Sequence, residues 1–87
     1  DPKDIVIDLR SKAAYDEWHF PNALYLDFPQ ALRAYGAFDA GQSYLLYCEF
    51  GLKSAHLADL MRRAGMHARH LSGGLREAKR LADEVDR

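Results

Sequence analysis

The chain's only cysteine stands in a seven-residue stretch whose residue types suit sulfur chemistry, Cys48-Glu49-Phe50-Gly51-Leu52-Lys53-Ser54. A thiol reacts as its thiolate, and its pKa falls near a helix N-terminus or a cation. Lys53 supplies a cation, and Gly51 permits the tight or left-handed conformation of a loop wrapped around one atom. Inward-facing loop amides would form an anion-binding nest for a thiolate, a persulfide or an oxyanion. We therefore interpret this stretch as an active-site loop.

The flanking residues predict that Cys48 lies between a strand and a helix. Residues 44–47, Tyr-Leu-Leu-Tyr, have the length and composition of a buried strand. After the loop, apolar residues fall on one face at the helical spacing: Leu57, Leu60, Met61 and Ala64. Cys48 is thus expected at the carboxyl end of a strand, where open α/β sheets bind ligands. A buried structural cysteine is the alternative, because free cysteine is among the most buried residue types.

Strand and helix patterns alternate along the rest of the chain. We expect further strands at residues 4–9, 23–26 and 66–71, a helix capped by Ser11 that runs to residue 17, and a helix at residues 28–35 closed by Gly36. The last helix has an apolar face formed by Leu75, Ala78, Leu81, Ala82 and Val85. This alternation predicts an α/β domain with a mainly parallel sheet and helices on both faces. Because the chain begins almost inside a strand, we expect residues 1–87 to be one domain excised from a longer multidomain protein.

Composition sets limits on the function. The chain has 87 residues, 48% of them hydrophobic and 29% charged, which is typical of one globular domain. A formal net charge of -1 provides no overall attraction to nucleic acid. One cysteine excludes an internal disulfide and a multi-cysteine zinc site, and it fits a reducing compartment. No apolar run approaches the length of a membrane span. We therefore expect a cytoplasmic protein with no membrane partner and no metal.

Four short motifs occur in a fixed order along the chain: Ile7-Asp8-Leu9-Arg10, His19-Phe20-Pro21-Asn22-Ala23, the loop from Cys48 to Ser54, and Leu71-Ser72-Gly73-Gly74. Together they resemble the motifs of rhodanese-type sulfurtransferase domains over nearly the whole chain. Departures from that pattern are Trp18 where glycine usually precedes the histidine, Asn22 in place of glycine, and Ala78 at the usual tryptophan position. Residues 45–51 resemble most the C-terminal rhodanese domain of the tRNA sulfurtransferase family, which makes 4-thiouridine and serves thiamine thiazole synthesis.

The resemblance implies a sulfur relay without a cofactor. Cys48 would accept sulfane sulfur from a cysteine desulfurase or from thiosulfate, and would hold it as a persulfide. The amides of the loop would stabilise the terminal sulfur; the loop residues are Glu49, Phe50, Gly51, Leu52, Lys53 and Ser54. Asp8 and Arg10 would support the end of their strand rather than touch substrate. Transfer-RNA would be bound only by domains outside these 87 residues.

Three alternatives remain beside this interpretation. A stand-alone thiosulfate sulfurtransferase would use the same loop with a different acceptor. A rhodanese-like module kept only for docking would not need the cysteine, and the intact Cys48, Gly51 and Lys53 argue against it. Cysteine phosphatases place an arginine six residues after the cysteine, where this chain has Ser54. Bidentate phosphate binding by a guanidinium is therefore lost, and we do not expect phosphatase chemistry.

Overall fold

The sheet contains four parallel strands. The structure, a computed structural model, describes residues 3–85; the outer ends of the predicted domain, residues 1–2 and 86–87, lie outside that range. The strand order is β2-β1-β3-β4, with β1 at Ile5–Asp8, β2 at Leu24–Tyr25, β3 at Ser43–Tyr47 and β4 at His67–His70. In the parallel register Asp8 is opposite both Tyr25 and Tyr47. The carboxyl ends of β1, β2 and β3 therefore meet at one edge, and the residues that follow them are brought together there.

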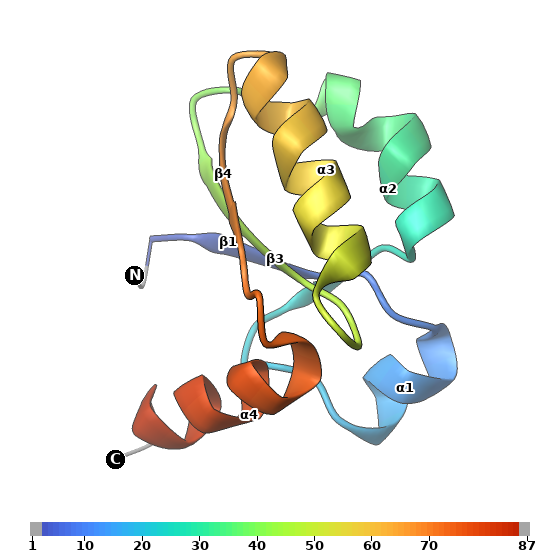
Figure 1. Cartoon of the computed structure of the whole chain (residues 1–87), viewed down its shortest axis with the longest axis vertical. Helices are drawn as coiled ribbons and strands as arrows, with labels where there is room; N and C mark the ends of the chain where they lie inside the picture. The colour runs from blue at the N-terminus through green and yellow to red at the C-terminus, as the bar shows by residue number, and fades with distance from the viewer. Residues whose placement is uncertain (1–2, 86–87) are drawn as a thin grey trace.

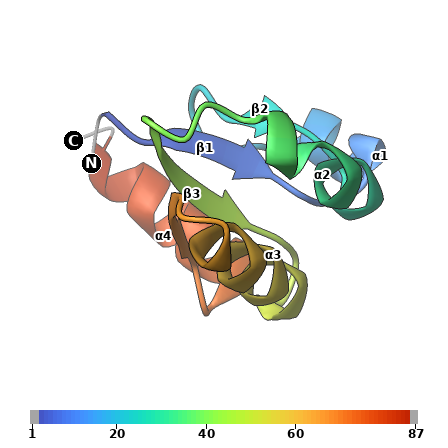
Figure 2. The same ribbon diagram turned by 90° about the horizontal axis from the view of Figure 1, so that it is seen from above.

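Helices cover both faces of this sheet. They are α1 at Lys12–Glu17, α2 at Phe28–Ala34, α3 at Leu52–Arg63 and α4 at Gly74–Val85, with a 3-10 turn, η1, at Tyr35–Ala37. Figure 1 shows α2 and α3 together on one side of the strands and α1 and α4 on the other. Seen from above, β1 and β3 cross the middle of the molecule between α2 and α4 (Figure 2). The α/β class, the parallel sheet and the two covered faces are thus confirmed.

Alternating strand residues divide the core into two clusters, because successive side chains point to opposite faces of a sheet. The larger cluster contains Ile7 and Leu46 and packs them against Leu57 and Met61 of α3. The smaller cluster contains Val6, Leu45 and Tyr47 on the other face, with Ala78 of α4. Trp18 and Phe20 are partly buried and pack against the smaller cluster.

The helix starts have local causes in the sequence. The hydroxyl of Ser11 accepts a hydrogen bond of 3.2 Å from the amide of Ala14, as a capping residue does. At α2, Asp27 forms a capping box with Gln30: the Asp27 carboxylate accepts from the Gln30 amide at 2.9 Å, and the Gln30 side chain accepts from the Asp27 amide at 3.1 Å. This second cap was not among the expectations from the sequence, although it fixes the start of α2.

Several predicted details were wrong. Gly36 does not close α2 in a left-handed conformation but lies within the 3-10 turn that continues the helix. Ala64 is exposed and Leu60 is half-buried, because the face of α3 that meets the sheet is formed by Ser54, Leu57, Ala58 and Met61. Val85 is 64% exposed, since the last turn of α4 extends past the sheet. Among the described residues, no helix is both long and apolar enough to cross a membrane.

Candidate active site

Cys48 lies immediately after β3, and the loop that follows it leads into the first turn of α3. Gly51 is the residue before the helix and has a φ of 93°, which is in the left-handed region. That conformation turns the chain back over the cysteine, and L-residues with a side chain rarely adopt it. The cysteine therefore faces the unpaired amides at the start of a twelve-residue helix.

Two backbone amides and one hydroxyl contact the sulfur. The amide of Gly51 donates to Sγ at 3.2 Å, and the amide of Ser54 donates to it at 3.3 Å. The Ser54 hydroxyl is hydrogen-bonded to Sγ at 3.5 Å and donates to the Gly51 carbonyl at 3.2 Å. Ser54 is fully buried, so water does not compete for these contacts. The loop thus forms a cradle of donors around one atom, as an anion-binding nest does.

The cradle changes the acidity of the thiol. Burial raises the pKa of Cys48, because a charged sulfur is less well solvated there. Hydrogen bonds from the hydroxyl and amide of Ser54 and from the amide of Gly51 outweigh burial, with a smaller contribution from the nearby amide of Lys53, and the net result is a pKa below the ordinary thiol value. A larger fraction of Cys48 is therefore thiolate at neutral pH than for a free cysteine.

Close packing of two glycines holds the loop against the turn between β4 and α4. A Cβ on Gly51 would lie 2.3 Å from the Ser72 carbonyl oxygen, and a Cβ on Gly74 would lie 2.3 Å from the Glu49 carbonyl oxygen. The amide of Leu75 donates to that Glu49 carbonyl at 3.0 Å. The active-site loop and the Leu-Ser-Gly-Gly turn can approach this closely only because both positions lack a side chain.

A buried polar network supports the strands beneath the loop. The Asp8 carboxylate accepts from Nε of Arg10 at 3.0 Å and from Nη2 at 2.7 Å, and it accepts from the Tyr47 hydroxyl at 2.6 Å. The Tyr47 hydroxyl in turn accepts from the Phe20 amide at 2.9 Å. Burial and the bond to Asp8 raise the pKa of Tyr47, which stays neutral as a donor. Because Tyr47 precedes Cys48, this network fixes the end of β3 relative to β1.

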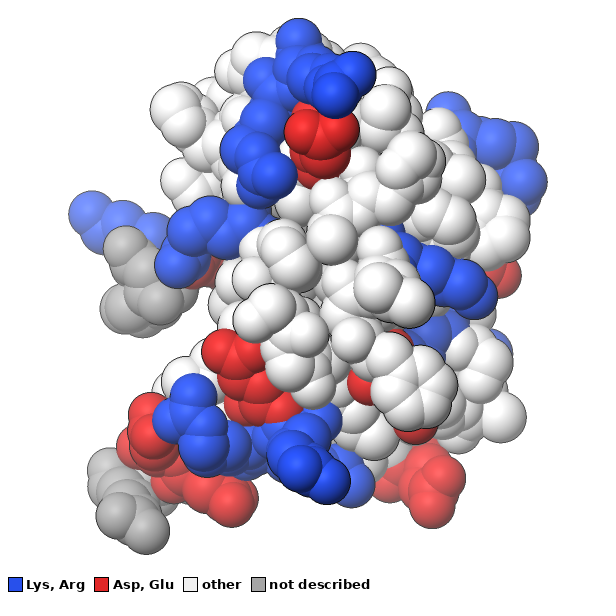
Figure 3. Space-filling view, in the orientation of Figure 1, with Lys and Arg blue, Asp and Glu red and all other residues white. Residues whose placement is uncertain are grey.

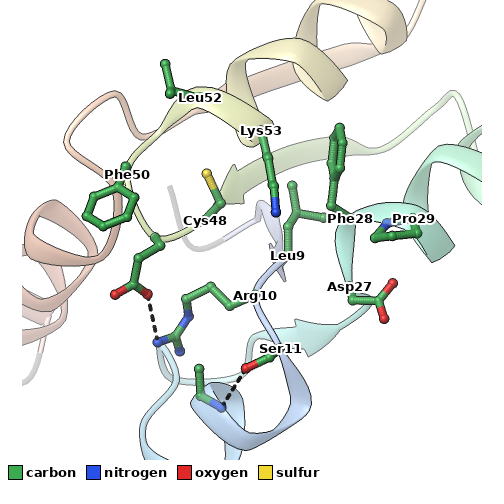
Figure 4. A pocket seen from close by; sticks show the side chains of 12 residues that line it. Leu9, Arg10, Ser11, Asp27, Phe28, Pro29, Cys48, Phe50, Leu52 and Lys53 are labelled. Atoms are coloured by element: carbon green, nitrogen blue, oxygen red, sulfur yellow. Dashed lines mark hydrogen bonds and ion pairs between the residues drawn. The ribbon is translucent and has the colours of Figure 1, made fainter.

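A pocket of about 510 Å³ opens over the sulfur (Figure 4). Its apolar wall combines residues from four segments: Leu9, Ala14, Phe28, Pro29, Phe50 and Leu52. Phe50 and Leu52 are 78% and 80% exposed, so the mouth of the pocket carries two apolar side chains in contact with solvent. In Figure 4 the Lys53 side chain points into the space between Cys48 and Phe28, and the Asp27 carboxylate points away from the cysteine. Cys48 itself is only 4% exposed, so just a small part of it meets the bottom of this open pocket.

The comparisons agree with this geometry. Residues 1–81 match the family described as rhodanese-like domain. The chain belongs to the rhodanese-like domain family. It is 40% identical over 68 residues to the tRNA sulfurtransferase of Thermoplasma acidophilum and 39% identical over 64 residues to that of Thermoplasma volcanium. These matches cover 77% and 74% of the chain but only 14% and 13% of the relatives, so the chain spans about one seventh of their length.

Solved structures share the fold at low sequence identity. A rhodanese-related protein from Thermoplasma volcanium superposes with a TM-score of 0.81 at 15% identity, covering 91% of this chain and 79% of that one. A rhodanese-like domain protein from Staphylococcus aureus superposes with a TM-score of 0.74 at 20% identity, covering 84% and 72% of the two chains. These likenesses show the rhodanese fold, and the sequence relatives are named tRNA sulfurtransferases.

Within this rhodanese-like domain the predicted site residues separate into three groups. The pocket is lined by five loop residues and by Arg10; the loop residues are Cys48, Glu49, Phe50, Leu52 and Lys53. Gly51 and Ser54 contact the sulfur through their amides. Asp8 does not line the pocket and contacts Arg10 and Tyr47 instead.

The sequence analysis missed one side of the pocket and one member of the buried network. Asp27, Phe28 and Pro29 line the pocket opposite the loop. They follow β2, so the rule that ligands bind beyond the carboxyl ends of parallel strands could have found them. Tyr47 was assigned only to the strand, and no sequence signal shows that its hydroxyl reaches Asp8. Among the described residues, no group of three or more His, Cys, Asp or Glu side chains could hold a metal ion.

Proposed function

We propose that this rhodanese-like domain is a sulfur carrier in which Cys48 accepts one sulfane sulfur and passes it to an acceptor. The observation that carries the proposal is the sulfur of Cys48, hydrogen-bonded by two amides at the bottom of an open pocket. Such a cradle stabilises negative charge on sulfur. It suits both the attacking thiolate and the terminal sulfur of a persulfide.

The loading step conserves atoms and electrons. The Cys48 thiolate attacks the outer sulfur of a donor persulfide, R-S-SH, and a new sulfur–sulfur bond forms. The donor's own sulfur–sulfur bond breaks, its electron pair leaves with R-S⁻, and the proton stays on the transferred sulfur. With thiosulfate as donor, the same attack releases sulfite. We propose a cysteine desulfurase or thiosulfate as the source and 4-thiouridine in tRNA as the destination; the name of the relatives, tRNA sulfurtransferase, supports tRNA as the acceptor.

Delivery of the sulfur depends on parts beyond this domain. Transfer proceeds by attack of the persulfide on an activated acceptor, or by release of sulfide when a second thiol attacks Cys48. Cys48 is the only cysteine in the 87 residues, so a second thiol would come from outside them. The chain spans about one seventh of the length of its tRNA sulfurtransferase relatives. We therefore propose that other domains of a longer protein bind tRNA, activate the uridine and carry any role in thiamine thiazole synthesis. We propose that this longer protein is cytoplasmic.

Intact mass spectrometry tests the loading step directly. The chain is incubated with a cysteine desulfurase and cysteine, or with thiosulfate, and its mass is then measured before and after addition of reductant. We expect a gain of one sulfur atom that reductant reverses and that is absent in Cys48→Ala. An unchanged mass with both donors would contradict the proposal and leave a docking module as the better interpretation.

A further inference from the structure

The buried guanidinium of Arg10 at the pocket is already hydrogen-bonded to other groups of the domain. Arg10 is one of two basic residues among the described residues that line the pocket, and the other is Lys53. The Nε and Nη2 atoms of Arg10 donate to the Asp8 carboxylate, and Nη2 also donates to the Trp18 carbonyl. The guanidinium is packed near the rings of Trp18 and Tyr47, at 6.0 and 5.6 Å from their centroids. Only Nη1 remains to face the pocket.

Glu49 neutralises that remaining group. Its Oε2 lies 4.0 Å from Nη1 of Arg10, and this ion pair bridges the residue after the cysteine and the segment after β1 (Figure 4). The Glu49 side chain is 50% exposed, while that of Arg10 is only 5% exposed. A solvent-accessible carboxylate therefore lies between an entering ligand and the buried guanidinium. With Asp8 and Glu49 both beside it, Arg10 adds no net positive charge to the pocket.

Apart from Arg10 and Lys53, no Lys or Arg among the described residues lines the pocket. Many of the Lys and Arg side chains visible in Figure 3 gather over the C-terminal end of α3, where Arg62 and Arg63 stand. The active-site loop is at the opposite end of that helix. The mouth of the pocket carries the apolar side chains of Phe50 and Leu52. A small dianion thus meets one unneutralised cation, Lys53, together with the carboxylates of Glu49 and Asp27 and apolar surface.

We propose that Glu49 is a specificity-determining residue that disfavours dianionic sulfur donors and favours a persulfide carried on a cysteine side chain. The inference rests on the proposed sulfur-loading function. Thiosulfate carries two negative charges, whereas a cysteine persulfide carries at most one, so the Glu49 carboxylate repels thiosulfate more strongly. Apolar groups that flank a donor cysteine in a polypeptide would contact Phe50 and Leu52, and thiosulfate has no such groups.

The test compares rates of persulfide formation on Cys48 with two donors. One donor is thiosulfate, and the other is a cysteine desulfurase with cysteine; time-resolved intact mass spectrometry gives a second-order rate constant for each. Glu49→Gln removes the charge and keeps the shape, while Glu49→Asp keeps the charge and shortens the side chain. Glu84→Gln is the matched control, because it changes the net charge equally from an exposed position on α4.

We expect Glu49→Gln to raise the ratio of the thiosulfate rate to the desulfurase rate by roughly tenfold. This is the size of effect expected when one unit of negative charge near a bound dianion is removed. The increase appears in the second-order rate constant for thiosulfate and shrinks at high ionic strength, because salt screens exposed charges. Glu49→Asp changes the ratio much less than Glu49→Gln, and Glu84→Gln leaves it at the wild-type value.

Two results would overturn the inference. An unchanged ratio in Glu49→Gln would show that the carboxylate does not select the donor. Equal increases in Glu49→Gln and Glu49→Asp would show that loop geometry, not charge, controls the donor. Failure of the wild-type chain to take sulfur from either donor would instead refute the loading function itself, and the selectivity proposal with it.

Discussion

The hydroxyl of Ser54 has a predictable effect on the reactivity of the thiol. Ser54→Ala removes the 3.5 Å contact with Sγ and leaves the amide of residue 54 in place. A hydrogen bond to a charged group contributes about 1.5–3 kcal/mol. We use the lower end, because the single hydroxyl proton is donated to the Gly51 carbonyl while the thiol is neutral and must turn to the sulfur once the thiolate forms. A loss of about 1.4 kcal/mol is tenfold in an equilibrium constant, so the variant should hold about tenfold less thiolate at a given pH below its pKa.

The assay is the rate of alkylation of Cys48 by iodoacetamide as a function of pH. Loss of a donor raises the pKa of Cys48, so the Ser54→Ala profile moves to higher pH. At a pH below both pKa values the variant reacts about tenfold more slowly, and at strongly alkaline pH, where both thiols are ionised, the two rates converge. Ser43→Ala is the control, because Ser43 is an exposed serine at the far end of β3.

Superimposed profiles for Ser54→Ala and the wild type would refute the reasoning, because the thiolate would then depend on the amides alone. A uniform decrease at every pH would also contradict it, since that result indicates restricted access rather than a changed pKa. Urea unfolding of both variants shows whether the fold is retained and separates these outcomes from a loss of structure.

Two further substitutions test the supports of the loop. Gly51→Ala should lower the free energy of unfolding by more than about 1 kcal/mol and displace the loop, because the new Cβ would lie 2.3 Å from a carbonyl oxygen. Gly65→Ala is the control, because Gly65 also has a positive φ but has no atom within 4 Å of an added Cβ. It should lower the free energy of unfolding by less in the same urea titration. Asp8→Ala should cost about 3–5 kcal/mol, because it leaves the buried guanidinium of Arg10 without its main counter-charge. Equal costs for the two glycines, or a small cost for Asp8→Ala, would contradict these accounts.

Local patterns were sufficient to predict most of the fold. Strands and helices of the expected type occur in the expected order, because apolar periodicity reflects which side of each element is buried. Errors are concentrated at helix ends. Ala64 and Val85 continue the apolar spacing, but both are exposed: Ala64 is the cap that follows α3, and Val85 is the last residue of α4. Gly36 was expected to end α2, but it lies inside a 3-10 turn that continues from the helix.

The sequence by itself determined that a lone cysteine follows a buried strand and precedes a helix, because residue types and spacing within a dozen residues specify both elements. Only the tertiary structure decided what surrounds that cysteine. The ion pair of Glu49 with Arg10, the contact of Gly51 with Ser72 and the bond from Tyr47 to Asp8 join segments far apart in the chain. Such contacts depend on strand order and register, which bring distant residues together at one edge of the sheet and which no local pattern specifies.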